Sequence, residues 1–412
     1  MKSLRSRLPV SPLPWKWNRR LRWIALGVAG AVVVGGIVAV ILVQRSDSDS
    51  GEAPVSAIPP DIRKLIDRLS PAQKADEVVV SGFEGAADGA QQAGAAQLGG
   101  LLVGPEDWQG AGGPALLARL HSAGSTGGRI PPLIVGTQQG GIYRAYPGLP
   151  PAEGQAQIGA ADDAAKARGW AEAAGTGLLE AGFDVNLAPL ADIATLDSPL
   201  SDRVFSDDPE VVTKMTRAAT DGCAASGLAC ALPYFPGLGG ASQSTEDGPA
   251  TVSLDTASLE ARDLAPFRAA IAQKVPALVL SLAFYAAYDP VTPAALSPSI
   301  AQGLLRDQLG FQGVAITDDL TAGAVAQGIG APQAAVQALA AGSDLVVVDD
   351  PAQAAAARKA IGGAISSGAI PGDRVDEAVG RILVLKQGLG LIAGPPRPEK
   401  PKPKQAAKPK KR

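Results

Sequence analysis

The stretch "GVAITDD" (313–319) is a short apolar run that ends at two adjacent carboxylates, Asp318 and Asp319. Continuous runs of Val, Ile and Ala are typical of strands that are buried on both faces of a parallel sheet. Seven other runs have the same character: 76–83, 98–104, 131–137, 182–190, 227–235, 275–284 and 343–350. Ala-rich segments between the runs predict crossover helices over 164–180, 209–225, 257–272, 298–309 and 332–341.

Strands that alternate with helices in this way predict an α/β fold, and eight of them predict a (β/α)8 TIM-type barrel. An open, doubly wound parallel sheet is the alternative. In a barrel, catalytic groups lie at the carboxyl ends of the strands. Those ends would carry Thr137, Tyr234, Leu282, Asp318 and Asp349. Asp318 and Asp319 therefore lie where a barrel enzyme keeps its chemistry, although acids at a strand end also serve as caps of the helix that follows.

Charge is unevenly distributed along the chain. Residues 1–22 and the segment from Pro395 onward each carry +7, so the part between them carries −17 and the whole chain −3. An acidic domain binds nucleic acid poorly, and we expect no such partner. Residues 23–44 are uncharged and long enough to cross a bilayer as a helix. The basic flank predicts a cytoplasmic N-terminus and an extracytoplasmic domain at the cell membrane. A cleaved signal peptide, with secretion, is the alternative.

The composition divides the chain into five parts. A polar, Pro-containing linker follows the apolar segment, and a Lys/Pro-rich tail ends the chain. We expect the tail to be disordered and its charge to favour contact with anionic envelope polymers. The predicted parts are a basic cytoplasmic segment (1–22), a transmembrane anchor (23–44), a linker (45–60), the barrel (61–393) and the tail (394–412).

The chain has two cysteines, Cys223 and Cys230, and one histidine, His121. On one continuous helix the two cysteines would lie about 10 Å apart, too far for a disulfide, whereas a helix that ends near Gly227 would permit one. Both states stay open. These residues cannot form a Cys/His metal framework, and we expect neither a metal nor a cofactor. His121 is predicted to be a solvated side chain on a surface helix, which argues against a Ser-His-Asp triad.

Motifs spread over residues 61–393 resemble, in their order, the N-terminal barrel domain of glycoside hydrolase family 3. The likeness is to the single-domain bacterial β-N-acetylglucosaminidase-like branch. The motifs are "PLIVGTQQGG" (132–141), "YPGLP" (146–150), "GFDVNLAPLADI" (182–193), "DRVFSDDPEVV" (202–212), "YFPGLG" (234–239), "LSPSIAQGLLRDQLGFQGVAITDDL" (296–320) and "RVDEAVGRILVLKQGLGL" (374–391). The resemblance implies a retaining glycosidase, which needs a carboxylate nucleophile and an acid/base group about 5 to 5.5 Å apart.

The resemblance also implies roles for individual residues. Asp318, the first Asp of "TDDL", has the position of the nucleophile, and Glu246 in "STED" has that of the family's acid/base histidine. Glu246 is the one candidate acid/base, with a plain surface charge on a loop as the alternative. The predicted substrate-binding residues are Arg203 in "DRVF", Thr137, Gln138 and Tyr234.

The chain departs from the family's pattern at several sugar-binding positions. The strand-five motif K-H-F-P-G-H-G reads "PYFPGLG" (233–239), the strand-three motif D-Q-E-G-G-R reads "TQQGGI" (137–142), and Leu282 replaces a strand-six histidine. Each lost charged hydrogen bond weakens transition-state binding.

Two functions are therefore predicted. The first is a membrane-anchored, extracytoplasmic retaining hydrolase of β-N-acetylglucosaminide-like wall fragments. The second is a catalytically inactive relative that binds a glycan or a protein at the cell envelope, and the departures favour impaired or absent hydrolysis.

Overall fold

The eight predicted apolar runs all form strands, which the computed structural model arranges as a closed parallel barrel in the order β1-β10-β9-β7-β5-β4-β3-β2. The structure describes residues 58–95, 97–110, 112–194, 197–321 and 328–393. The barrel strands are β1 (Val79–Ser81), β2 (Gly100–Leu102), β3 (Leu133–Gly136), β4 (Val185–Asn186), β5 (Ala229–Phe235), β7 (Ala277–Leu280), β9 (Val314–Asp319) and β10 (Leu345–Val348). The prediction of a (β/α)8 barrel is confirmed.

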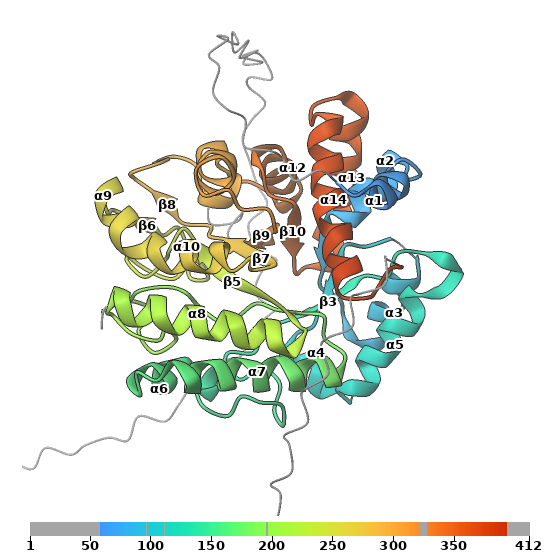
Figure 1. The fold of residues 1–412 in the computed structure, drawn as a ribbon. Helices are drawn as coiled ribbons and strands as arrows, with labels where there is room; N and C mark the ends of the chain where they lie inside the picture. The colour runs from blue at the N-terminus through green and yellow to red at the C-terminus, as the bar shows by residue number, and fades with distance from the viewer. Residues whose placement is uncertain (1–57, 96, 111, 195–196, 322–327, 394–412) are drawn as a thin grey trace, which may run out of the picture. The chain divides into compact units, whose positions relative to one another are not determined.

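Helices surround the strands, whose labels lie towards the middle of Figure 1. The α-helices are α1 (Pro60–Ile66), α2 (Pro71–Glu77), α3 (Gly85–Ala95), α4 (Pro105–Gly110), α5 (Pro114–Gly124), α6 (Gln155–Ala160), α7 (Ala164–Ala181), α8 (Pro209–Ser226), α9 (Thr256–Ser258), α10 (Leu264–Ala272), α12 (Ala331–Ala341), α13 (Pro351–Ser367) and α14 (Gly372–Gly388). Short 3-10 or π segments are η1 (Thr126–Gly128), η2 (Gly141–Tyr143), η3 (Leu259–Asp263), η4 (Ala294–Leu296) and η5 (Ser299–Gln308). The five predicted crossover helices correspond to α7, α8, α9 to α10, η5 and α12.

A buried carboxylate, Asp344, ties together several elements at the amino-terminal end of the barrel. It lies just before β10 and accepts hydrogen bonds from Arg374 at 2.7 Å, Arg381 at 3.0 Å, the backbone N–H of Ala315 at 3.0 Å and the Arg306 guanidinium. Burial alone would raise the pKa of Asp344, but the three guanidinium groups outweigh it and hold that pKa below its usual value. The cluster therefore joins η5, β9, β10 and α14.

A second buried ion pair joins the beginning and the end of the barrel. Lys386 on α14 and Glu77 at the end of α2 are both fully buried, with 2.5 Å between Nζ and Oε1. Lys386 also donates to the carbonyl of Leu98 at 3.3 Å, just before β2. Burial raises the pKa of Glu77 to about 7 against the opposing field of Lys386. The pair thus links α14, near the end of the barrel, to the start of β1 and β2.

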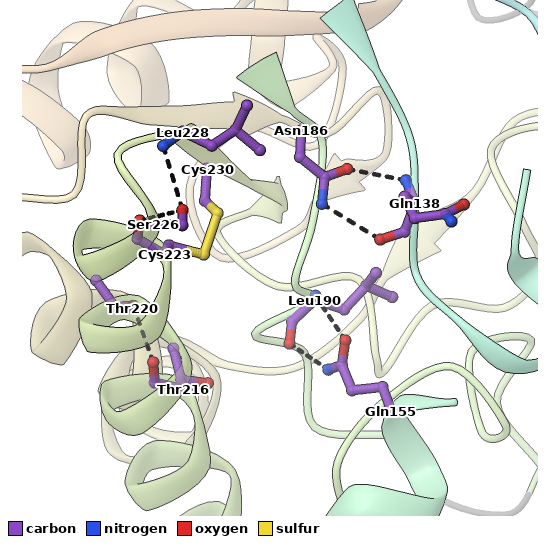
Figure 2. The surroundings of a disulfide bond; sticks show 10 residues. All are labelled: Gln138, Gln155, Asn186, Leu190, Thr216, Thr220, Cys223, Ser226, Leu228 and Cys230. Atoms are coloured by element: carbon purple, nitrogen blue, oxygen red, sulfur yellow. Dashed lines mark hydrogen bonds between the residues drawn. A yellow bond between two sulfur atoms is a disulfide. The ribbon is translucent and has the colours of Figure 1, made fainter. Parts of the chain in front are cut away.

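Cys223 and Cys230 form a disulfide, which connects α8 to β5 (Figure 2). Helix α8 ends at Ser226, and Gly227 follows with φ of 88°, in the left-handed region that favours glycine. Because the chain reverses at Gly227, the two Cα atoms lie 6.0 Å apart rather than at their spacing on one continuous helix. Of the two states that the sequence left open, the structure has the disulfide.

The structure corrects the prediction for His121 and does not describe the predicted terminal segments. His121 is not a freely solvated side chain: on α5 its ring is half-buried, with Nε2 2.8 Å from the carbonyl oxygen of Gly182, because α5 packs against the end of α7. The predicted basic cytoplasmic segment (1–22), the anchor (23–44), most of the linker (45–60) and the tail (394–412) lie outside the described residues. Within the described ranges, no helix combines the length and apolar character needed to span a membrane.

The Asp344 cluster gives a test of the barrel's stability. Asp344→Asn should lower the free energy of unfolding by about 3 to 5 kcal/mol, because it removes the buried carboxylate that three largely buried guanidinium groups share. Asp307→Asn, which removes an exposed carboxylate from the neighbouring η5, is the matched control and should change it by less than about 0.5 kcal/mol. Chemical denaturation at pH 7 measures both, and equal effects would contradict this account.

Candidate active site

Asp318 is the second-last residue of β9, at the carboxyl end of the barrel, and its side chain is half-buried. Its Oδ1 accepts a hydrogen bond from the backbone N–H of Asp319 at 3.0 Å, and its Oδ2 accepts one from the Thr245 hydroxyl at 3.4 Å. The capping role belongs instead to Asp319, whose Oδ1 accepts from the backbone N–H groups of Thr321 and Asp349, both at 3.0 Å. Asp318 is therefore the carboxylate left to face the site.

The surroundings of Asp318 disfavour its charged form. The pKa of Asp318 is raised to about 6, mainly by burial and in addition by the negative charges of Asp319 and Glu246. The hydrogen bond from the Asp319 backbone and the Arg203 guanidinium act in the opposite direction without cancelling the rise. At neutral pH the carboxylate is mostly ionised and is therefore able to act as a nucleophile.

Arg203 lies at the centre of the site and contacts residues from β5 and from the loops that follow β3 and β5. It donates from Nε to Gln139 Oε1 at 3.1 Å and from an Nη to the Tyr234 hydroxyl at 3.2 Å, and its other Nη lies 3.7 Å from Glu246 Oε1. Its guanidinium also lies over the rings of Tyr143 and Tyr234, at 5.1 and 5.7 Å from their centroids. Although burial disfavours the cation, Tyr234 and Glu246 raise the pKa of Arg203, so it stays charged.

An irregularity in β5 directs Tyr234 towards Arg203. The pairing of β5 with β7 shifts register between Leu232 and Phe235, and Tyr234 has φ of 65°, an uncommon value for a residue with a side chain. Such backbone strain is often found at functional sites. Burial raises the pKa of the Tyr234 hydroxyl well above its usual value, so it acts as a neutral donor or acceptor.

Hydrogen bonds from buried polar groups fix the turn after Tyr234. Tyr285 donates from its hydroxyl to the Gly237 carbonyl at 3.0 Å, and Asp192 accepts from the Leu238 N–H at 2.6 Å. Gly237 has φ of 124°, and a Cβ built there would lie 2.8 Å from the Cβ of Asp263, so only glycine fits. These contacts fix the turn that carries Tyr234.

The loop with Glu246 is held by a small sheet that the sequence did not indicate. Strand β6 (Thr251–Val252) pairs in parallel with β8 (Phe284–Tyr285), which joins the segment after β5 to the segment after β7. Thr245 is buried against Asp318, whereas Glu246, the next residue, has 49% of its side chain exposed. Glu246 therefore combines access to solvent with a place beside Arg203, and it is not an isolated surface charge.

Thr137 and Gln138 lie directly after β3 and contact the loop that follows it rather than Arg203 or Asp318. Gln138 is fully buried, and its side-chain amide donates to the carbonyls of Tyr146, Leu149 and Pro150, each at 3.2 Å. Its backbone exchanges two hydrogen bonds with the Asn186 side chain, as Figure 2 shows. Thr137, half-buried, donates its N–H to the Tyr146 hydroxyl at 3.1 Å. Gln138 thus positions the loop between β3 and α6.

Comparison with known proteins identifies the family. Residues 73–385 match the glycosyl hydrolase family 3 N terminal domain. The chain belongs to glycosyl hydrolase family 3. It is 33% identical over 230 residues to a beta-hexosaminidase of Stenotrophomonas maltophilia, covering 54% of this chain and 68% of that one. It is also 33% identical over 231 residues to a beta-hexosaminidase of Xylella fastidiosa, with the same coverage.

Two solved structures support the same assignment. A glycoside hydrolase family 3 beta-N-acetylglucosaminidase from Paenibacillus has 30% identity and a TM-score of 0.73, covering 82% of this chain and 66% of that one. A beta-N-acetylhexosaminidase from Beutenbergia cavernae has 29% identity and a TM-score of 0.68, covering 77% of this chain and 98% of that one. The chain thus spans about two thirds of the Paenibacillus protein and nearly all of the Beutenbergia one.

This family 3 barrel brings together four of the six predicted site residues: Asp318, Glu246, Arg203 and Tyr234. Sequence reasoning did not propose Gln139, Tyr143 or Thr245 as site residues. Their signal was sequence position alone: Gln139 and Thr245 lie within the motifs "TQQGGI" and "STED", and Tyr143 directly follows the first of these. In the described ranges, no group of three or more His, Cys, Asp or Glu side chains is arranged to hold a metal ion.

The raised pKa of Asp318 gives a second test. The pKa of Asp318 is about 6 in the folded state against 3.8 in the unfolded state, so folding disfavours the ionised carboxylate. The stability that the protonated form contributes is therefore present at low pH and is lost as pH rises through 6. On going from pH 4 to pH 7.5, the free energy of unfolding of Asp318→Asn should therefore rise relative to that of the wild type by about 1 to 3 kcal/mol. Unfolding curves at both pH values measure this, and a pH-independent difference would be the contrary result.

Proposed function

We propose that this family 3 protein hydrolyses β-linked hexosaminides of the N-acetylglucosaminide kind with retention of configuration, with Asp318 as nucleophile and Glu246 as acid/base. One observation carries this proposal: Glu246 pairs with Arg203, and Thr245, its neighbour on the same loop, contacts Asp318. Both carboxylates thereby border one site at the carboxyl end of the barrel. The beta-hexosaminidases to which the chain is similar support the substrate class.

The reaction would proceed in two steps. In the first, an Asp318 carboxylate oxygen attacks the anomeric carbon while Glu246 gives its proton to the departing glycosidic oxygen, which forms a glycosyl ester and releases the aglycone alcohol. In the second, Glu246 takes a proton from water, whose oxygen attacks the same carbon and releases Asp318. The half-exposed carboxyl of Glu246 has access to the water that this second step needs. Since the nucleophile must be ionised, turnover should rise as pH increases through about 6.

Glycan binding without turnover is the second candidate function. The resemblance places basic residues where this chain has Ile142, Pro233 and Leu282, and Arg203 is already engaged by Gln139, Tyr234 and Glu246. A site with fewer free donors stabilises the transition state less. A catalytically inactive member acting as a glycan-binding or protein-interaction module at the envelope would have these features.

We further propose that the protein acts outside the cytoplasm, anchored in the cell membrane through residues 23–44, with secretion as the alternative. The uncharged segment with its basic flank supports this topology. The Cys223–Cys230 disulfide supports export as well, because disulfides persist in oxidising compartments. On this basis the ligand is a glycan or cell-wall fragment, and the basic tail is suited to anionic envelope polymers.

A fluorogenic N-acetyl-β-glucosaminide assay on the full chain tests the hydrolysis. Asp318→Asn should lower turnover at least about 10³-fold, because it removes the nucleophile. Glu246→Gln should lower it by about 10²- to 10⁴-fold, and by less for a substrate whose dinitrophenolate leaving group needs no proton.

The matched controls are Asp307→Asn and Glu180→Gln, which change exposed carboxylates on η5 and α7 and should leave turnover unchanged. Absence of turnover in the wild type, or equal turnover in all five proteins, would exclude hydrolysis by these residues. Binding of wall glycans without turnover would favour the second candidate function.

A further inference from the structure

The side-chain amide of Gln139 has two donors that no described protein group uses. Its Oε1 accepts a hydrogen bond from Arg203 Nε at 3.1 Å. Because a guanidinium can only donate, the amide oxygen faces Arg203 and the Nε2 group points away from it. Within the described ranges, Nε2 donates a hydrogen bond to no protein atom. The two N–H groups of Nε2 are therefore available to a ligand.

This amide is held in one position by its surroundings. Gln139 is only 4% exposed, and its backbone N–H donates to the Tyr143 carbonyl at 3.4 Å. The next residue, Gly140, has φ of 80°, and a Cβ built there would lie 2.2 Å from the carbonyl oxygen of Glu153, so the loop is closely packed. Nε2 is nevertheless not one of the described unpartnered side-chain atoms that are sealed from solvent. A fixed, largely buried donor that a ligand can reach is suited to bind an acceptor of that ligand.

Gln139 also lies beside the groups to which the reaction is assigned. The same Arg203 donates to the Tyr234 hydroxyl at 3.2 Å and lies 3.7 Å from Glu246 Oε1. The field of its guanidinium acts on Asp318 as well. A sugar bound between Asp318 and Glu246 would therefore be next to the cluster that contains the Gln139 amide.

We infer that Gln139 is a specificity-determining residue, whose Nε2 donates to the carbonyl oxygen of the substrate's 2-acetamido group; this inference rests on the N-acetylglucosaminide class of the proposed function. A carbonyl oxygen can only accept, so an ionised carboxylate such as that of Asp318 cannot bind it. The sugar hydroxyls, in contrast, are able to donate to carboxylates. The amide of Gln139 thus matches the group that distinguishes an N-acetylglucosaminide from a glucoside.

A glutamate at position 139 would not have this capacity. The motif D-Q-E-G-G-R of the family resemblance has Glu where "TQQGGI" (137–142) has Gln139. A carboxylate there would accept from Arg203 as the amide oxygen does, but it would have no N–H for a carbonyl. Glutamine therefore keeps the acceptor for Arg203 and adds two donors.

Calorimetric titration of the full chain with methyl N-acetyl-β-D-glucosaminide and methyl β-D-glucoside tests the inference. Gln139→Glu removes the donors and keeps an acceptor for Arg203. It should weaken binding of the N-acetylated sugar at least about fivefold and change that of the glucoside by less than about twofold. Gln139→Met, which is neutral and removes donors and acceptor together, should show the same selective loss.

Gln337→Glu is the matched control, because it makes the same change at an exposed position on α12 and should bind both sugars as the wild type does. A melting curve for each variant verifies that it is folded. The carbonyl contact itself is isolated by an analogue in which sulfur, a weaker acceptor, replaces the acetamido oxygen. Replacing oxygen with sulfur should weaken binding more in the wild type than in Gln139→Glu.

Three results would overturn the inference. The first is equal binding of the two sugars by the wild type, or no measurable binding of either. The second is an equal loss for both sugars in Gln139→Glu. The third is a loss in Gln139→Met alone, which would mean that Gln139 only positions Arg203.

Turnover of a fluorogenic N-acetyl-β-glucosaminide on the same preparations separates this inference from the proposed hydrolysis. Wild-type turnover together with an unselective Gln139→Glu would leave hydrolysis standing and remove the role of Gln139. A selective loss of binding in Gln139→Glu, with no turnover by the wild type, would do the reverse.

Discussion

Closure of the barrel by the pairing of β1 with β10 is the constraint on which the rest of the structure depends. Where the barrel closes, helix α14 packs near the start of the barrel, and the buried Glu77–Lys386 pair joins α14 to the end of α2, just before β1. Asp344 does the same for β9 and β10, with three guanidinium groups around one carboxylate. Both clusters lie towards the amino-terminal ends of the strands. The stabilising charges are thus kept apart from the carboxyl ends, where a barrel places its chemistry.

The carboxyl ends are organised around Arg203 rather than around a metal or a histidine. Its contacts bring together Gln139 on the loop after β3, Tyr234 in β5 and Glu246 on the loop after β5. The register shift in β5 positions Tyr234, and the small β6–β8 sheet positions the loop with Glu246. Asp318 remains half-buried, where the fields of Asp319 and Glu246 oppose that of Arg203.

Much of the fold could be predicted because buried parallel strands leave a direct signal: each of the eight apolar runs contains its strand. The site was only partly predictable, because its geometry depends on contacts between distant residues. Gln139 meets Arg203 across 64 positions, and the pairing of Thr251 with Phe284 leaves no mark in either short segment. The disulfide depended on the left-handed turn at Gly227. Likewise, sequence could not assign capping to Asp319 and leave Asp318 to the site, because both are adjacent aspartates at one strand end.

The most direct test of the central claim, that Asp318 is the nucleophile of a retaining glycosidase, is to trap the covalent intermediate. A 5-fluoro-β-glycosaminide with an activated leaving group forms the glycosyl ester faster than it is hydrolysed, and intact-mass spectrometry with peptide mapping locates the adduct. We expect one glycosyl unit per chain, attached to Asp318 within residues 313–321 and absent in Asp318→Asn. No adduct on the wild type, or an adduct on any other residue, would contradict the assignment.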